Sequence, residues 1–337
     1  RIPMFDAGLS LITQTSLFRK CIFRVDRYTA IPYNRHTRKF MSWILFAIIA
    51  NVLFAVSNLF DKFLIEKRVR EPLALSVLGG WIDFLFAMGI ILIHGFSITS
   101  SLQMTILLIS GVFVELALIP YFKALSLEDA SRISPLFQSM PVFVLLLSYI
   151  FLREALTLRQ LLGFLLILIG SIIVSIQKTD AGGFKIRKVF LWVLLASLLW
   201  ALPAVMFKFV IVNQNFWDAL ACEFFGVTIG ATILFFLYSK RVIAQIKEIK
   251  AGTWSILNIN EFIYIVGRMS NFYAIKLGPV SLVAVLGGTI PLFVFLFGLV
   301  LSIWFPDIIK EDITIASIIT KLSAIALVAC GLWFINL

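Results

Sequence analysis

Long apolar stretches separated by short polar segments make up most of this chain. From about residue 43 onward, ten stretches each hold roughly 20 predominantly apolar residues, the length that an α-helix needs to cross the hydrocarbon core of a bilayer. They run at about 43–64, 74–93, 102–124, 130–151, 158–176, 189–211, 215–238, 254–277, 280–304 and 316–336. The pattern predicts an all-α integral membrane protein with ten transmembrane helices.

The composition agrees with a membrane environment. Of the 337 residues, 61% are hydrophobic and only 14% are charged, and the mean hydropathy is +1.02. A soluble chain of this length cannot bury so much apolar surface. We therefore expect a multi-pass protein of the plasma membrane, or of the inner membrane if the source is bacterial. The formal net charge of +11 is then assigned to loops beside anionic lipid headgroups, and nucleic acid is not an expected partner.

The two halves of the chain repeat each other. Residues 122–143 align without a gap on residues 272–293 at an offset of 150, and this alignment superposes Pro141 on Pro291. In an apolar chain, matching segments that each contain a proline indicate a transporter built from duplicated units around a central site.

A second block supports the duplication. The segment that begins at Ile44 aligns on the segment that begins at Phe190 at an offset of 146, and Lys62 coincides with Lys208. Each unit holds five expected spans, and because five is odd, the second unit must enter the membrane upside down. We expect two inverted five-helix repeats joined by a polar linker, with boundaries at 41–177, 178–188 and 189–337.

The first 40 residues differ from the rest. They hold eight of the 29 Lys and Arg residues, two acidic residues and no apolar run of spanning length. We interpret residues 1–40 as a disordered extension with no part in transport. A basic, acid-poor segment is also typical of a targeting or membrane-surface sequence, which is the alternative.

Three features resemble the EamA-type transporters of the drug/metabolite transporter superfamily. They are the proline within 130–151, the segment LREALTLRQLLGFLLILIGSIIV from Leu152, and FYAIKLGPVSLVAVLGGTIPLF from Phe272. The resemblance extends over nearly the whole chain from about residue 43, and it rests on small, apolar and proline positions. By this resemblance, Glu154 is the acidic residue that usually follows the fourth helix.

The resemblance implies a secondary transporter that exports a small metabolite, such as an amino acid, by alternating access. It places the third, fourth, eighth and ninth spans around a cavity and the second and seventh at the periphery. Two alternatives stay open: an exporter of lipophilic cations, and a scaffold or lipid-handling protein on the same fold that transports nothing. The substrate, the coupling ion, for which protons are a candidate, and the choice between monomer and homodimer also stay open.

The sequence leaves the orientation in the membrane open. The loops that follow odd-numbered spans hold more Lys and Arg than the others, and the positive-inside rule would then put both termini outside. The family resemblance implies both termini in the cytoplasm.

Ionisable residues inside spans are the first candidates for binding, because each is costly in the bilayer centre and usually faces a cavity or a partner. One polar stripe recurs at three- and four-residue steps in the eighth span: Asn258, Glu261, Tyr264, Arg268 and Asn271. It indicates a cavity wall for a polar or zwitterionic solute. The alternative is structural, with Arg268 paired to Glu115, or to Glu261 through water.

Other intramembrane polar residues have weaker assignments. Glu115, in the middle of the third span, is expected to line the site. Three acids in the second and seventh spans are expected at interfaces or in packing, with Glu223 deep enough to require a partner: Asp83, Asp218 and Glu223. Three residues of the first span are expected to bond to neighbouring helices more often than to solute: Asn51, Asn58 and Asp61.

The two matched prolines predict helix bends. A proline frees a carbonyl group one turn earlier, so Pro141 and Pro291 can expose backbone to a solute. The side chains just before them, Gln138, Ser139 and Thr289, are therefore candidate binding residues. A simple kink for packing is the alternative.

Enzyme chemistry has little support in the sequence. Its two histidines are His36 and His94, so neither an HExxH zinc site nor a Ser–His dyad can form within the spans. A phosphate-binding GxxxxGK[ST] loop is also absent. Its three cysteines are scattered and are interpreted as small apolar residues. We expect a protein that is not an enzyme, with neither a cofactor nor a metal site.

Overall fold

A computed structural model describes residues 36–97, 100–125, 127, 134–175, 186–304 and 315–336. The chain divides into two units, Arg1–Phe40 and Met41–Leu337. Most of the expected N-terminal extension, and residues 178–185 of the expected linker, lie outside the described residues. Residues 186–188 of that linker already belong to a helix.

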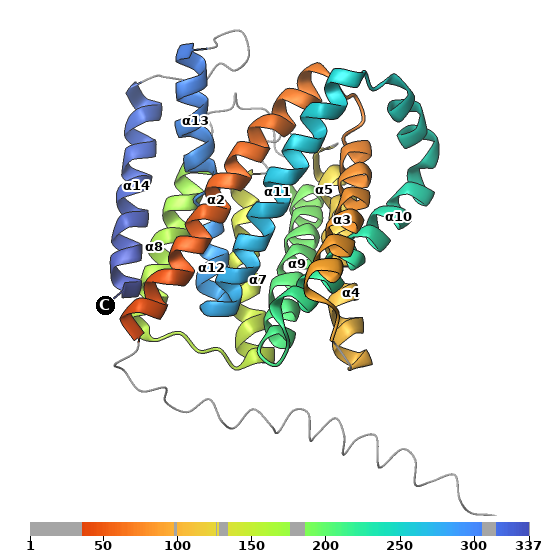
Figure 1. The fold of residues 1–337 in the computed structure, drawn as a ribbon. Helices are drawn as coiled ribbons and strands as arrows, with labels where there is room; N and C mark the ends of the chain where they lie inside the picture. Colours follow the sequence, from red (N-terminus) through yellow and green to blue (C-terminus); the bar gives the residue numbers. More distant parts are fainter. Residues whose placement is uncertain are drawn as a thin grey trace, which may run out of the picture. The chain divides into compact units, whose positions relative to one another are not determined.

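The described part of the chain is helical and contains no strand (Figure 1). Helical segments occupy all ten predicted stretches. In chain order these are α2 (His36–Lys67), α3 (Pro72–His94), α4 (Ser101–Leu116), α5 (Leu118–Leu125), a 3₁₀ segment (Ser134–Gln138), α7 (Ser139–Leu147), a π-helical turn (Ser148–Leu152), α8 (Leu158–Ser175), α9 (Ile186–Ile211), α10 (Phe216–Glu248), α11 (Ala251–Leu277), α12 (Val280–Gly287), α13 (Ile290–Trp304) and α14 (Ile315–Asn336).

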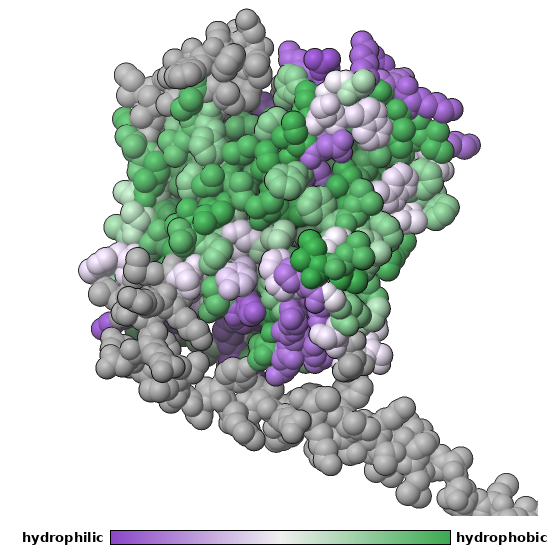
Figure 2. Space-filling view, viewed as in Figure 1, coloured by the Kyte–Doolittle hydropathy of each residue, from purple (hydrophilic) through white to green (hydrophobic). Residues whose placement is uncertain are grey.

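Six helical segments of the described residues are long and apolar enough to cross a membrane: Ser42–Ile65, Pro72–His94, Ser101–Ala124, Val189–Ile211, Phe216–Glu248 and Val280–Gly298. Three further apolar segments are shorter, and α11 carries many polar residues. Figure 2 shows a broad hydrophobic band on the viewed face, with hydrophilic side chains gathered toward its two ends. The protein is therefore an all-α, multi-pass membrane protein.

Glycines set the packing of α10 between α3 and α4. A methyl group at Gly111 would overlap the α10 backbone at Glu223, and one at Gly226 would overlap the α4 backbone at Leu108. On the other side of α10, Gly80 of α3 meets the side chain of Ala231. Small residues let helix backbones approach closely in a membrane, where dispersion contacts replace the hydrophobic effect as the force between helices.

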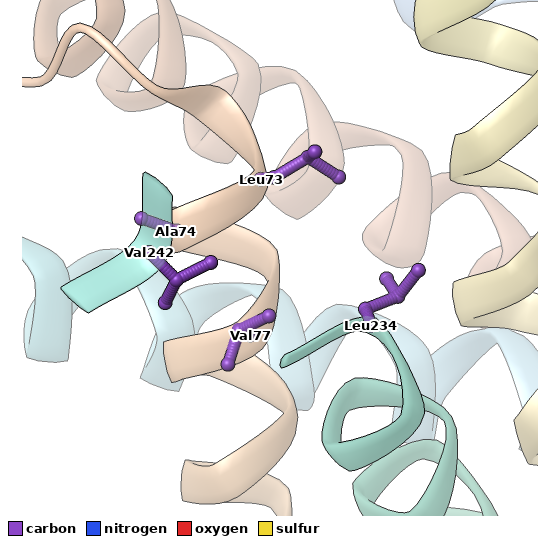
Figure 3. Packing of buried hydrophobic residues seen from close by; sticks show 5 residues of the cluster. All are labelled: Leu73, Ala74, Val77, Leu234 and Val242. Carbon is purple, nitrogen blue, oxygen red and sulfur yellow. The ribbon is translucent and has the colours of Figure 1, made fainter. Parts of the chain in front are cut away.

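A bend in α10 lets this helix follow α3 around the bundle. Tyr238 has non-helical backbone angles of φ −123° and ψ 23°. Leu234 before the bend and Val242 after it pack on the first turns of α3, against the side chains shown in Figure 3, which are Leu73, Ala74 and Val77.

Helices α2 and α11 lie antiparallel along most of their length. Ser270 donates a hydrogen bond to the carbonyl oxygen of Phe46 at 2.9 Å, and toward the other end Asn260 donates to Asp61 at 2.7 Å. These contacts give α11 a long apolar neighbour, although α11 itself carries many polar residues. Away from this pair, α8 packs against α14 through Gly163 and Gly331.

Substituting Gly226 by Ala tests the close packing of α10 on α4. We expect a loss of about 1–3 kcal/mol in unfolding free energy, because the new methyl group must push against backbone. Thermal unfolding in detergent measures the loss. The matched control is Gly89→Ala in α3, where nothing lies within 4 Å of the new methyl group. Equal melting temperatures for the two variants would show that the glycine contact does not matter.

Candidate functional site

A cavity of about 810 Å³ lies among α2, α3, α4, α5 and α11, with Trp200 of α9 also in its wall. It reaches the end of the bundle where α2 ends and where α3 and α11 begin, because Lys62, Ile65, Pro72 and Trp254 line it there. Lys62 and Ile65 are exposed, so this end of the cavity is its mouth.

At the deep end of the cavity, one arginine holds two acidic side chains. Nη1 of Arg268 lies 2.5 Å from Oδ2 of Asp83, and its Nη2 lies 2.5 Å from Oε2 of Glu223. The guanidinium also lies 4.6 Å from the ring centroid of Phe224. Arg268 is only 6% exposed, so its charge is compensated by protein groups rather than by water. We call this cluster of three ionisable residues the arginine tie.

The arginine tie corrects one sequence-based expectation and confirms another. The structural alternative paired Arg268 with Glu115, or with Glu261 through water; its ion-pair partners are instead Asp83 of α3 and Glu223 of α10. Glu223 does have the partner that its depth required. Asp83 was assigned to packing at the periphery, but it lines the cavity as well as binding Arg268. The signal that could have identified it is its position as a lone acid in the middle of an apolar span.

Nearer the mouth, two glutamates lie at one depth. The carboxyl group of Glu261 lies against the backbone of Gly79, and Cβ of Glu115 lies against Gly230. The next residues of these two helices, Gly80 and Ala231, contact each other, so the two glutamates lie at the same level of the bundle. Asp83 follows Gly79 by four residues, so the arginine tie lies about 6 Å deeper along α3.

Both glutamates lack a partner among the described residues. Glu115 is 7% exposed, and its Oε2 makes no hydrogen bond. Glu261 is half-buried, and its carboxyl group forms neither a hydrogen bond nor an ion pair with the described part of the chain. A buried polar atom without a partner requires an explanation, and at a membrane protein's cavity the usual one is function.

Asp61 belongs to the same level. Its Oδ1 accepts a hydrogen bond of 2.7 Å from Nδ2 of Asn260, the residue next to Glu261. This bond confirms that polar residues of the first span bond to neighbouring helices, yet Asp61 and Asn260 also line the cavity. We call Asp61, Glu115 and Glu261 the acid layer. Sequence reasoning missed Asn260 because it lies beside the polar stripe rather than on it.

The predicted polar stripe of the eighth span divides between the cavity and other surroundings. Glu261, Tyr264 and Arg268 line the cavity, as does Glu115 from α4. Asn258 is exposed, and Asn271 is half-buried outside the lining. The lining residues of α11 run from Trp254 to Arg268, so Asn271 lies beyond the deep end of the cavity, and Asn258 lies on an exposed side of the helix.

Gln138, Ser139 and Pro141 lie where the 3₁₀ segment passes into α7, outside the cavity lining. Pro141 is buried in the first turn of α7. The Oγ of Ser139 is buried and has no hydrogen-bond partner in the described residues. The proline thus stands at a change of helix type, where its missing N–H is tolerated.

In the second half, a turn at residues 288–289 separates α12 from α13 within one apolar helical segment, Val280–Gly298. Pro291 is the second residue of α13, and Thr289 lies in the turn. Asn51 of α2 donates hydrogen bonds to the carbonyl oxygen of Leu286 at 2.8 Å and to Oγ1 of Thr289 at 3.1 Å. Helix α12 packs against α7. The described residues of the fourth and ninth spans do not line the cavity, which α2 and α3 line instead. The expectation that these two spans surround the cavity is wrong for this cavity.

At the end of the bundle opposite the mouth, the turn between α11 and α12 is held by two charged side chains. Nζ of Lys208 donates to the carbonyl oxygens of Ile275 at 2.6 Å and Gly278 at 2.8 Å. The carboxyl group of Glu154 accepts from the backbone N–H groups of Val280 and Ser281 at 3.2 and 3.3 Å. A cation at a helix C-terminus and an anion at an N-terminus both match the helix dipoles. We call these contacts the end clamp.

The arginine tie can be tested by neutralising Arg268. We expect Arg268→Gln to lose about 3–5 kcal/mol of unfolding free energy, because it leaves Asp83 and Glu223 buried without a cation. Adding Asp83→Asn and Glu223→Gln should restore part of this loss. Thermal unfolding in detergent provides the comparison, with Lys276→Gln as the control, since Lys276 is an exposed cation on the same helix. Similar losses for Arg268→Gln and Lys276→Gln would contradict the tie.

Comparisons with known proteins agree with this architecture. An uncharacterized protein of Methanocaldococcus jannaschii is 31% identical over 135 residues, which are 40% of this chain and 96% of that protein. A solved crystal structure of another protein superposes with a TM-score of 0.68 at 16% sequence identity, covering 87% of this chain and 95% of that one, which shows a shared fold. The sequence profile of the EamA-like transporter family matches residues 41–176. This chain therefore belongs to the EamA-like transporter family of the drug/metabolite transporter superfamily.

Proposed function

We propose that this protein is a secondary transporter that moves a small, amine-bearing metabolite by alternating access between two inverted five-helix halves. The family is one of transporters, which supports transport in general and not enzyme activity. The observation that carries the choice of solute is the charge balance of the cavity. Its lining holds four carboxyl groups and two cationic side chains, Lys62 and Arg268.

The distribution of these charges favours an amine over an anion. Arg268 is held by two acids, so a solute carboxylate would have to displace one of them. The acid layer, by contrast, has carboxyl groups without a basic partner, and each ionised one requires a positive charge from solute or proton. An amino acid is a member of this class: its ammonium would meet the acid layer, and its carboxylate would face Lys62 at the mouth. The outward direction follows from the family resemblance.

Ten crossings in two inverted halves are supported by three observations. Helix α11 is 27 residues long, enough to cross a bilayer, and it runs antiparallel to α2. A relative with about the length of one half aligns over 96% of itself, as expected for a duplicated unit. The sequence repeat superposes Lys62 on Lys208, and these two lysines lie at opposite ends of the bundle.

The two lysines differ in their contacts, and this difference supports alternating access. Lys208 closes its end of the bundle through the end clamp, while Lys62 is exposed at the mouth. In an inverted repeat, the opposite-facing state exchanges the roles of the two halves. Lys62 would then bind carbonyl groups at the closed mouth, and Lys208 would be released.

A second candidate cargo is a lipophilic cation. Aromatic rings attract cations over their faces, and the cavity wall contains Tyr121, Trp200, Trp254 and Tyr264. The acid layer would serve such a cation equally well. The two cargo classes differ in what surrounds the charge, so flux of both must be compared.

Solute flux in proteoliposomes tests the proposed transport. We expect amine solutes to be moved, with release or uptake of protons if protons are the counter-ion. Glu261→Gln and Glu115→Gln should each reduce flux about tenfold or more, because a charge-assisted contact is worth about 1.5–3 kcal/mol. Glu248→Gln is the control, since Glu248 is an exposed glutamate of α10.

The outcome depends on both flux and stability. Unchanged flux in the two cavity variants would refute the acid layer as the binding site. A loss of flux that parallels a loss of melting temperature would mark Glu115 and Glu261 as folding residues. Absence of flux for every amine and lipophilic cation would favour a membrane scaffold over a transporter.

The two lysines give a separate test of alternating access. We expect Lys208→Met to weaken the end clamp and shift the population toward a state that is open at that end. Lys62→Met should shift it the other way, because it removes the residue expected to close the mouth. Modification rates of a single cysteine placed at Ser76, beside the mouth, report the two states. Lys240→Met, an exposed lysine on α10, should leave the rate unchanged; the same rate in all variants would argue against the exchange of roles.

A further inference from the structure

We infer that the cavity is built for a linear aliphatic diamine or polyamine, in which two ammonium groups are separated by methylene groups. This inference rests on the proposed transport function and specifies its solute. It comes from the acid layer taken together with the residues between and around its three carboxyl groups.

The acid layer presents three carboxyl groups from three different helices. Asp61 comes from α2, Glu115 from α4 and Glu261 from α11. The nearest basic side chains are Lys62, which is exposed, and Arg268, which is occupied by Asp83 and Glu223. Neighbouring positions such as Asp61 and Lys62 point away from each other on a helix. A solute with a single ammonium group would therefore leave two of the three carboxyl groups without a positive partner.

The lining of the cavity includes aliphatic surface as well as carboxyl groups. Aliphatic residues come from four helices: Leu75, Leu78, Val114, Leu118 and Leu257. Such surface suits a chain of methylene groups. Carboxyl groups together with aliphatic surface thus match ammonium groups joined by methylene groups.

A metal ion is a poorer match to the same carboxyl groups. Within the part of the chain that the structure describes, no three His, Cys, Asp or Glu side chains converge closely enough to hold a metal ion. Two glycines also shape the space: Gly79 makes room for the carboxyl group of Glu261, and Gly230 makes room for Glu115.

Three probes with the same carbon chain test the inference. Putrescine carries two ammonium groups, butylamine carries one, and γ-aminobutyrate carries one ammonium and one carboxylate. Binding to the purified, full-length protein in detergent is measured by calorimetry. We expect putrescine to bind about tenfold or more tightly than either of the other two probes. Equal affinities for putrescine and butylamine would overturn the inference.

Two cavity variants sharpen the test. In Asp61→Asn and Glu115→Gln, the affinity for putrescine should fall toward that for butylamine, while the affinity for butylamine changes much less. A merely structural role of these acids would lower both affinities together and would overturn the inference. Glu248→Gln should keep the wild-type preference. If a variant does not fold, the three probes on the wild-type protein still decide.

The same series distinguishes this inference from the proposed function. Flux of butylamine or of a lipophilic cation without a preference for putrescine would leave a transporter whose solute is not a diamine. Tight and selective binding of putrescine, without flux of any solute in proteoliposomes, would support the diamine site and refute transport.

Discussion

The ion pairs of Arg268 with Asp83 and Glu223 are the contact on which the arrangement of the cavity depends. A lone charge at the centre of a span costs about 2.5–3.5 kcal/mol or more, so Arg268 of α11 needs acidic partners. Asp83 of α3 and Glu223 of α10 supply them. At the same level, Gly111 of α4 packs on the α10 backbone at Glu223. One buried cation therefore fixes the mutual positions of four helices, and the cavity lies directly above it.

The sequence repeat and the acids of the cavity follow different rules. The repeat superposes Pro141 on Pro291, near the starts of α7 and α13, and Lys62 on Lys208. The cavity acids break the repeat: at the offset of 150, Glu115 corresponds to Ile265 and Glu261 to Gly111. A position that carries a carboxyl group in one half thus carries an apolar or small residue in the other. On the proposed inverted repeat, a symmetric scaffold would present an asymmetric wall to the solute.

The sequence predicted the helices well, because ten long apolar stretches leave few alternatives to helices in a membrane. It also identified Glu115, Glu261, Tyr264 and Arg268 as cavity residues from their polarity and spacing. It did not predict the ion pairs, since nothing in a helical stripe shows that Asp83, 185 residues earlier in the chain, lies beside Arg268. Which helices surround the cavity depended on the close approaches of Gly80, Gly111 and Gly226, and single-residue contacts of this kind carry no periodic signal.

The position of the acid layer above the arginine tie has a consequence for coupling. The tie is neutralised within the protein, so it does not need a ligand to remain buried. The acid layer is not: each ionised carboxyl group there remains unfavourable until a proton or an ammonium group reaches it. On the proposed function, protons and amine would compete for the carboxyl groups of the acid layer, so exchange of solute for protons would require no separate proton site.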